Sequence, residues 1–132
     1  SGNFHFSFSG LKTSVMNHIK KYDHPMHEGE INDVCASFQE AVVDVLVEKT
    51  MAACAELKCR TAILSGGVAA NSRLRAQLQN NMDTHGIRLY TPSKKYCTDN
   101  AAMIGIAGYL NYRRGHASPL DLAPKPSLRL VL

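Results

Sequence analysis

Two strand-length apolar runs separated by a helical pattern constrain the fold more than any other feature of the sequence. Residues 61–65 and 87–90 are mainly apolar, and each run ends at a turn sequence that contains glycine or proline. The first is typical of a buried strand. Residues 72–82 between them are rich in helix formers, which predicts a helix with Leu74 and Leu78 facing inward and Gly86 as a stop past its end. Strands that alternate with helices in this way predict an α/β fold with a mainly parallel sheet.

Four further segments have regular patterns. Residues 31–57 place apolar side chains mostly at intervals of three and four, which predicts one long amphipathic helix. Residues 11–22 form a shorter helical stripe, and residues 101–112 are apolar nearly all round, which predicts a helix buried on most sides. Aromatic and polar residues alternate over 4–9, so a first strand is expected there. The order becomes β-α-α-β-α-β-α, with helices flanking the sheet.

Length and composition fit a single globular core. The chain has 132 residues, of which 45% are hydrophobic and 20% charged, and these values exclude collagen-like and disordered classes. The longest nearly apolar stretch, 101–110, is too short to span a bilayer, so no membrane association is expected. We expect an α/β lobe over residues 1–115 and a proline-containing tail over 116–132.

The net charge and the cysteines restrict partners and compartment only loosely. The formal charge of +4 permits RNA or another polyanion as a partner without requiring one. Basic pairs on several elements would hold RNA phosphates if they converged, and otherwise form solvated faces: Lys20-Lys21, Arg73 with Arg75, Lys94-Lys95 and Arg113-Arg114. The four cysteines lack zinc-ligand spacing, which favours reduced, largely buried thiols in a cytosolic protein: Cys35, Cys54, Cys59 and Cys97.

The strongest candidate site follows the first of the two apolar runs. Gly66 and Gly67 come where a strand ends and a helix begins, and ligands of open α/β sheets bind at that edge. Glycines there let a nucleotide or sugar approach the backbone, and Asn71 offers both a donor and an acceptor. A tight turn with Asn71 or Ser72 capping the next helix explains the same residues without a ligand.

Three weaker candidates remain. Asp99 precedes the apolar helix, where its carboxylate could cap the helix or hold a cation. The segment 8–13 has hydroxyls and a lysine near an expected helix start, which could receive phosphate or could simply end a strand. His24 and His27 have a proline between them, so a loop explains them better than a metal pair.

Three motifs, taken in order, resemble one family. They are F-S-F-S-G-L-K-T over 6–13, S-G-G-V-A-A-N-S-R-L-R over 65–75 and Y-C-T-D-N-A-A-M-I over 96–104. The chain is similar to the tRNA threonylcarbamoyladenosine transferase family, formerly called O-sialoglycoprotein endopeptidase or glycoprotease. The resemblance implies the second lobe of an actin-like, Hsp70-like and sugar-kinase-like ATPase fold. We therefore expect roughly the last two fifths of a longer protein.

The resemblance also implies roles for particular residues. Gly66, Gly67 and Asn71 would line the pocket for an adenylate, and Asp99 would be a metal ligand. The family's other metal ligands belong to an H-x-x-x-H motif that this chain lacks. One divalent ion, iron or zinc, is thus implied for the full-length protein, and no catalytic residue is assigned here. The chain alone is expected neither to retain the ion nor to catalyse transfer.

The implied activity is transfer of a threonylcarbamoyl group from threonylcarbamoyl-adenylate to the adenosine next to the anticodon of tRNA. The implied partners in bacteria are a paralogous subunit and a small ATPase, and the implied location is cytoplasmic. Two alternatives stay open: a kinase-like phosphotransferase of the same fold, and a non-catalytic relative that docks partners. The sequence contains no H-E-x-x-H motif and no Ser-His-Asp arrangement that would support the former peptidase name.

Overall fold

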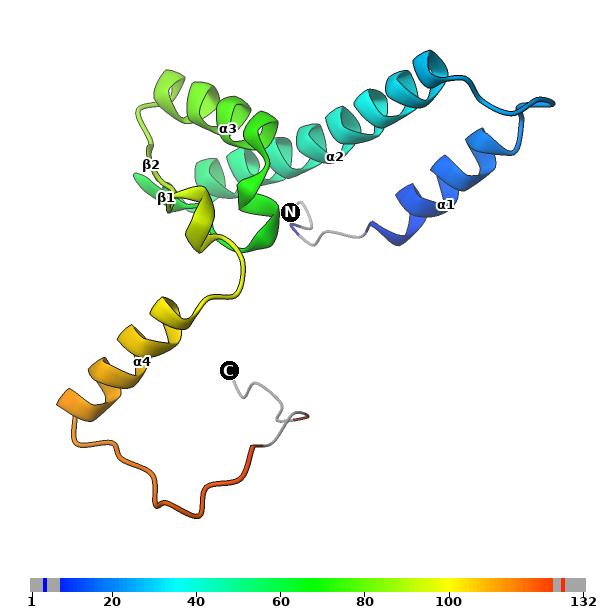
Figure 1. Ribbon diagram of the computed structural model, residues 1–132. Coiled ribbons are helices and arrows are strands. Elements are labelled where there is room, and N and C mark those ends of the chain that lie inside the picture. The colour runs from blue at the N-terminus through cyan, green and yellow to red at the C-terminus, as the bar shows by residue number, and fades with distance from the viewer. Residues whose placement is uncertain (1–3, 5–7, 125–126, 128–132) are drawn as a thin grey trace. The chain divides into compact units, whose positions relative to one another are not determined.

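A computed structural model describes Phe4, residues 8–124 and Ser127. The chain forms two compact units, Ser1–Thr98 and Asp99–Leu132. None of the helices over the described residues is long and apolar enough to cross a membrane. The elements of the first unit (Figure 1) are α1 (Ser9–Ile19), α2 (Glu28–Glu56), β1 (Thr61–Ile63), η1 (Gly67–Ala70), α3 (Ser72–Thr84), β2 (Arg88–Tyr90) and η2 (Lys94–Tyr96). The second unit contains α4 (Ala101–Arg113).

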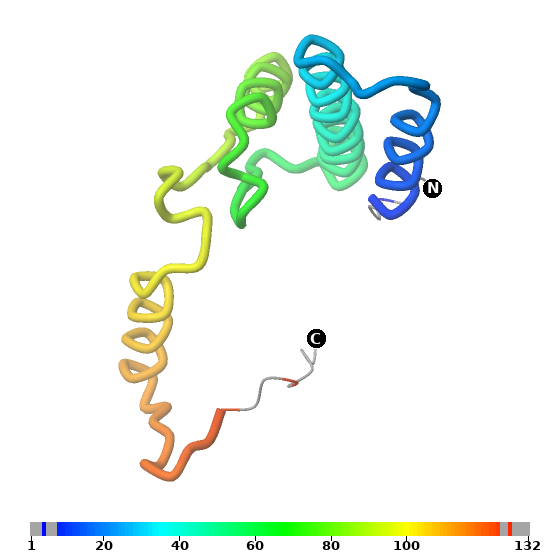
Figure 2. The backbone as a smooth tube through the Cα atoms, turned by 45° about the vertical axis from the view of Figure 1, so that its right-hand side comes forward, coloured from blue at the N-terminus to red at the C-terminus, as the bar shows by residue number. Residues whose placement is uncertain are grey.

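The two strands form a small parallel sheet. Thr61 lies opposite Arg88 and Ile63 opposite Tyr90, and the backbone N–H of Leu64 donates to the Tyr90 carbonyl at 2.9 Å. The crossover between the strands is η1 followed by α3 (Figure 2). The predicted parallel pairing of these runs, and with it the α/β class, is confirmed.

The core lies where α2 and α3 pack against each other and against one face of the sheet. Leu74 and Leu78 are 2% and 3% exposed, so the predicted inner face of α3 is confirmed. Met82, one turn further along, is completely buried. The residues that form this core are Val43, Val47 and Cys54 of α2 with Leu74, Leu78 and Met82 of α3. The strands contribute the partly buried side chains of Ala62, Leu64 and Leu89.

Two predictions about burial are wrong. Among the described residues of the first unit, helices pack on one face of the sheet, and Ile63 on the other face is 75% exposed. The predicted helix over 101–112 exists as α4, but its apolar side chains are exposed, with Ile104 at 66% and Leu110 at 47%. Apolar periodicity identifies a surface that favours burial, but it does not say which residues cover that surface.

The amino-terminal prediction holds only in part. Residues 5–7 of the expected strand lie outside the described residues. Phe8 is the N-cap of α1 and Ser9 its first residue, which contradicts a strand reaching position 9. The predicted helix over 11–22 is confirmed, although α1 ends at Ile19.

The predicted long helix is confirmed as α2, and His27, one of the two histidines considered as a metal pair, lies at its start. The Nδ1 of His27 accepts from the backbone N–H of Glu30 at 3.2 Å. In return, the Glu30 carboxylate accepts from the His27 backbone N–H at 3.1 Å. This reciprocal capping box satisfies two donors at the helix start. His27 therefore has a structural role at the start of α2.

Helices α2 and α3 end in the same backbone motif. Gly86 follows α3 with φ +65°, and the N–H of Ile87 donates to the Met82 carbonyl at 2.9 Å. This is a Schellman motif, which needs one residue in the left-handed region. The predicted stop at Gly86 is thus confirmed. Lys58 takes the equivalent place after α2, with φ +52°.

All four cysteines are free thiols, and their burial differs. Cys54 and Cys97 are buried, as predicted, and Cys59 is half-buried. Cys35 is exposed on α2, which contradicts the expectation for that position. Burial, followed by the neighbouring Cys59, raises the pKa of the Cys54 thiol. Cys54 thus acts as a small apolar core residue.

Candidate functional site

The turn after β1 has an open glycine surface. Gly66 adopts φ +88° and ψ 175°, a combination that is essentially restricted to glycine. The N–H of Ala69 donates to the Gly66 carbonyl and that of Asn71 to the Val68 carbonyl, both at 3.0 Å. No described atom lies within 4 Å of the place where a Cβ would stand on Gly66 or Gly67. A ligand can therefore reach this backbone without meeting a side chain.

The same turn leaves two backbone donors available. Among the described residues, the N–H groups of Gly67 and Val68 donate to no backbone or side-chain acceptor. Both lie beside the open glycine surface. A polar ligand that approached here would find hydrogen-bond donors.

Asn71 has a structural role and spare hydrogen-bonding capacity. Its Oδ1 accepts from the N–H of Leu74 at 3.0 Å, so the predicted capping of α3 by Asn71 is confirmed. Its Nδ2 donates to the Oε1 of Gln39 on α2 at 3.0 Å. An amide has two donor hydrogens and two acceptor lone pairs, so one of each remains. The two alternatives for Asn71, cap and ligand contact, are compatible.

A hollow of about 260 Å³ lies beside Asn71 on the side of α2. Most of its wall is apolar, and Gln39 and Asn71 add amide groups. An apolar wall with a few polar groups is the usual composition of a small-molecule site. The lining residues are Phe38, Gln39, Val42, Val43, Leu46, Val68, Asn71 and Leu74.

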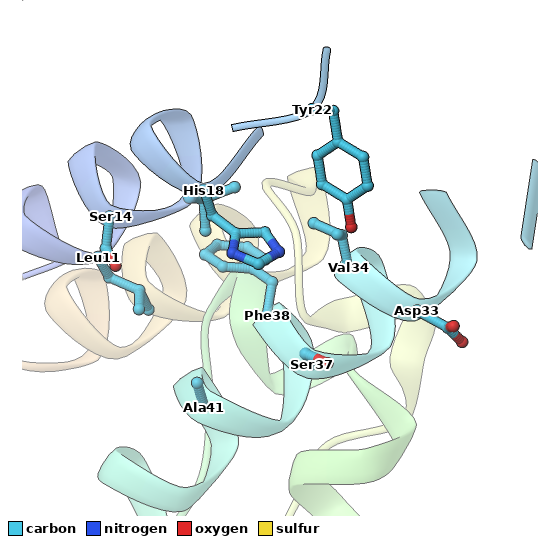
Figure 3. A pocket seen from close by; sticks show the side chains of 10 residues that line it. Leu11, Ser14, His18, Tyr22, Asp33, Val34, Ser37, Phe38 and Ala41 are labelled. Carbon is cyan, nitrogen blue, oxygen red and sulfur yellow. The ribbon is translucent and has the colours of Figure 1, made fainter. Parts of the chain in front are cut away.

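A second hollow, of about 310 Å³, lies between α1 and α2 (Figure 3). Its walls include His18 and Tyr22, whose rings meet edge to face at 5.8 Å, together with Asp33. Leu11 of the candidate segment 8–13 lines it, whereas Gly66, Gly67, Asn71 and Asp99 do not. The segment 8–13, proposed as a phosphate site, forms the first turn of α1, and Thr13 donates to the Ser9 carbonyl at 3.2 Å.

Several of the basic residues have partners within the first unit. Arg73 donates to both carboxylate oxygens of Glu40, at 2.8 and 2.5 Å, and Gln77 donates to the same carboxylate at 2.6 Å. Hydrogen bonding from Arg73 holds the pKa of Glu40 below its usual range. Lys94 Nζ donates to the Ser72 hydroxyl at 2.6 Å, joining η2 to the start of α3. The sequence did not indicate these partners, since Glu40 is remote from Arg73 along the chain.

Asp99 belongs to the second unit and does not cap α4. The cap is its neighbour Asn100, whose Oδ1 accepts from the N–H of Met103 at 3.0 Å. Asp99 itself is exposed. Over the described parts of the chain, no three His, Cys, Asp or Glu side chains are grouped to hold a metal ion. These residues alone do not form a metal site, and Asp99 could supply only one ligand to one.

Comparison with known proteins gives a consistent result. The family described as TsaD, tRNA N6-adenosine threonylcarbamoyltransferase, matches residues 2–106. Proteins with the name tRNA N6-adenosine threonylcarbamoyltransferase are similar over nearly the whole chain. One from Caldicellulosiruptor saccharolyticus is 45% identical over 97% of this chain, and one from Carboxydothermus hydrogenoformans is 48% identical over 96%. The chain covers 38% and 37% of these two relatives.

Proposed function

Because the chain belongs to the TsaD family of tRNA N6-adenosine threonylcarbamoyltransferases, we propose that it is part of an enzyme that modifies tRNA. The enzyme would transfer a threonylcarbamoyl group from threonylcarbamoyl-adenylate to the N6 amine of the adenosine next to the anticodon. The chain spans less than two fifths of its relatives' length, so it would supply one lobe of the site. Alone, it would be inactive.

The turn from Gly66 to Asn71 would hold the adenylate. The observation that carries this proposal is the open backbone at Gly66 and Gly67, beside the available N–H groups of Gly67 and Val68. These donors suit the oxygens of an adenylate phosphate. The apolar hollow next to Asn71 suits a base or ribose, with the spare amide groups of Asn71 for hydrogen bonding.

The turn would act by positioning its ligand. Holding the adenylate in one orientation removes much of the entropic cost of bringing it to the amine of the acceptor adenosine. The turn is suited to this role because α3 is anchored on α2 beside it, through Asn71 and Gln39. A fixed backbone loses little freedom when the ligand binds.

Asp99 would contribute one ligand to a divalent ion, iron or zinc, in the complete protein. A carboxylate is an acceptable ligand for either metal, and the remaining ligands would come from residues outside this chain. When bound, such an ion can polarise an acyl oxygen.

The proposed fold is one lobe of an actin-like enzyme. The enzyme would be located in the cytoplasm, with a paralogous subunit and a small ATPase as bacterial partners. The exposed face of the sheet at Ile63 is consistent with a lobe that packs against further structure.

The test compares the native-length protein that carries this chain with the 132-residue chain alone. Each is incubated with unmodified tRNA and threonylcarbamoyl-adenylate, and the modified nucleoside is quantified by mass spectrometry. Metal content is measured on the same samples. We expect modification and bound metal only in the longer protein, and loss of both on Asp99→Ala. ATP consumption without threonylcarbamoyl-adenylate, and no modified nucleoside, would instead favour the phosphotransferase alternative.

Two substitutions test the turn itself. Gly67→Ala adds a methyl group where this chain has open space, so a raised KM for threonylcarbamoyl-adenylate would report contact with the ligand. Gly108→Ala in α4 is the matched control, because its Cβ would also meet nothing within 4 Å and it lies outside the three motifs. Asn71→Asp keeps a capping oxygen for α3 but replaces a donor with negative charge, and should also raise that KM. Unchanged kinetics in both variants would refute the proposed role of the turn.

A further inference from the structure

One arginine joins the glycine turn to the segment that follows β2. Arg75 extends from α3, and its Nε donates to the carbonyl of Ala69 in the turn. Its Nη2 donates to the Pro92 carbonyl at 2.7 Å and approaches the Cys97 sulfur at 3.0 Å. The three acceptors come from two loops that are separate in sequence. One side chain therefore holds both loops.

These loops lie at the same edge of the sheet. Ala69 follows β1, and Pro92 follows β2 by two residues. Because the strands are parallel, their carboxyl ends face the same way, and loops at this edge form the ligand sites of α/β proteins. Ala69 is completely buried and Cys97 is 4% exposed, so the arginine contacts are partly shielded from water.

The chemistry of these contacts requires arginine. A guanidinium presents several N–H donors in one rigid plane, whereas a lysine ammonium is a single point on a flexible stem. The partners of Arg75 are neutral carbonyls and a thiol, and no carboxylate pairs with it over the described residues. Arg73, two positions earlier, is neutralised by Glu40. Arg75 thus keeps an unpaired positive charge next to the turn.

We propose that Arg75 is a positioning residue for the adenylate donor: it fixes the 66–71 turn against the 92–97 segment and places a positive charge beside the bound phosphate. This inference rests on the proposed function, because it assigns an anionic adenylate to the turn. It adds a residue that does not line the hollow beside Asn71. Without Arg75, the turn would lose its connection to the second loop and some attraction for the anion.

The experiment uses the native-length protein with Arg75→Met, Arg75→Lys and Arg75→Ala. Arg75→Met should raise the KM for threonylcarbamoyl-adenylate about tenfold or more, because the turn loses both its link to the second loop and the nearby positive charge. The KM for tRNA should stay unchanged. Arg75→Lys should restore affinity only in part, since it keeps the charge but lacks the planar donors. Added guanidinium ion should partly rescue Arg75→Ala.

Arg73→Gln is the matched control, because it removes another arginine from the same helix and leaves the turn contacts intact. Hydrogen exchange should accelerate at both 66–71 and 92–97 in Arg75→Met, and at neither in Arg73→Gln. If the wild type is active and both Arg75→Met and Arg75→Lys keep the wild-type KM for the adenylate, the proposed role of Arg75 is wrong, whereas the proposed function still stands. An inactive wild type overturns the proposed function and this role together.

Discussion

Arg73 on α3 and Glu40 on α2 form a two-point ion pair, with Nε 2.8 Å from Oε2 and Nη2 2.5 Å from Oε1. The pair joins the two helices that form most of the core. Both side chains are near half exposure, at 48% and 40%, so solvent screens their interaction. Its contribution is therefore best detected through its dependence on pH.

Acid should remove the effect of this pair. The bond from Arg73 lowers the pKa of Glu40 from its usual value of 4.5 in the folded chain. A carboxyl with a lowered folded pKa stabilises the fold above its unfolded pKa, and this contribution disappears as pH falls through the folded value. We expect Arg73→Gln to lower the urea midpoint at pH 7, and the difference from wild type to shrink below pH 4.5. A difference that persists unchanged at low pH would contradict the ion-pair explanation.

Lys58→Gly should stabilise the chain. The residue holds φ +52° in the Schellman motif of α2, where the N–H of Cys59 donates to the Cys54 carbonyl at 2.9 Å. A non-glycine residue in this region costs about 1 kcal/mol, and α3 places Gly86 at the equivalent position. We expect a gain of about 0.5–1 kcal/mol in the free energy of unfolding, measured by urea denaturation. Lys58→Ala keeps the strain and should give no gain; an equal gain would point to side-chain charge instead.

A side chain in the core beneath the sheet and one on the uncovered face of the sheet should differ in their sensitivity to truncation. Leu78→Ala removes a side chain that is 3% exposed, and should lower the free energy of unfolding by about 2–5 kcal/mol. Ile63→Ala, at 75% exposure, should change it by less than about 0.5 kcal/mol in this chain. Denaturation curves of the two variants measure both values. A large loss for Ile63→Ala would show that the outer face is covered.

The sequence predicted those features that depend on local chemistry. The spacing of Leu74 and Leu78 and the glycine at position 86 identified α3 because helical period and left-handed backbone are properties of neighbouring residues. The prediction that Asp99 could cap α4 was wrong: the cap is the next residue, Asn100, and both residue types cap helices equally well. Residue type alone does not show which of two adjacent capping residues accepts the hydrogen bond at the helix start.

Hydrogen bonds between residues far apart in the sequence could not be predicted from local patterns. Gln39 and Asn71 are 32 positions apart, and nothing in either segment indicates that their amides meet. The same holds for Arg75, which the sequence presented only as half of a basic pair. Its contacts with Ala69 and Pro92 depend on how two loops converge at one edge of the sheet. The glycine turn could be located from sequence, but the residues that hold it in place could not.

Gly66 and Gly67 should respond differently to alanine, although both have open space around them. Gly66 has φ +88°, so Gly66→Ala should cost about 1–3 kcal/mol of stability through backbone strain alone. Gly67 does not have a positive φ, and Gly67→Ala should leave the urea midpoint nearly unchanged. If Gly67→Ala is as stable as wild type yet binds adenylate poorly, the defect comes from the ligand's approach. If it unfolds as readily as Gly66→Ala, its kinetics report only damage to the fold, and the turn must be tested through Asn71→Asp instead.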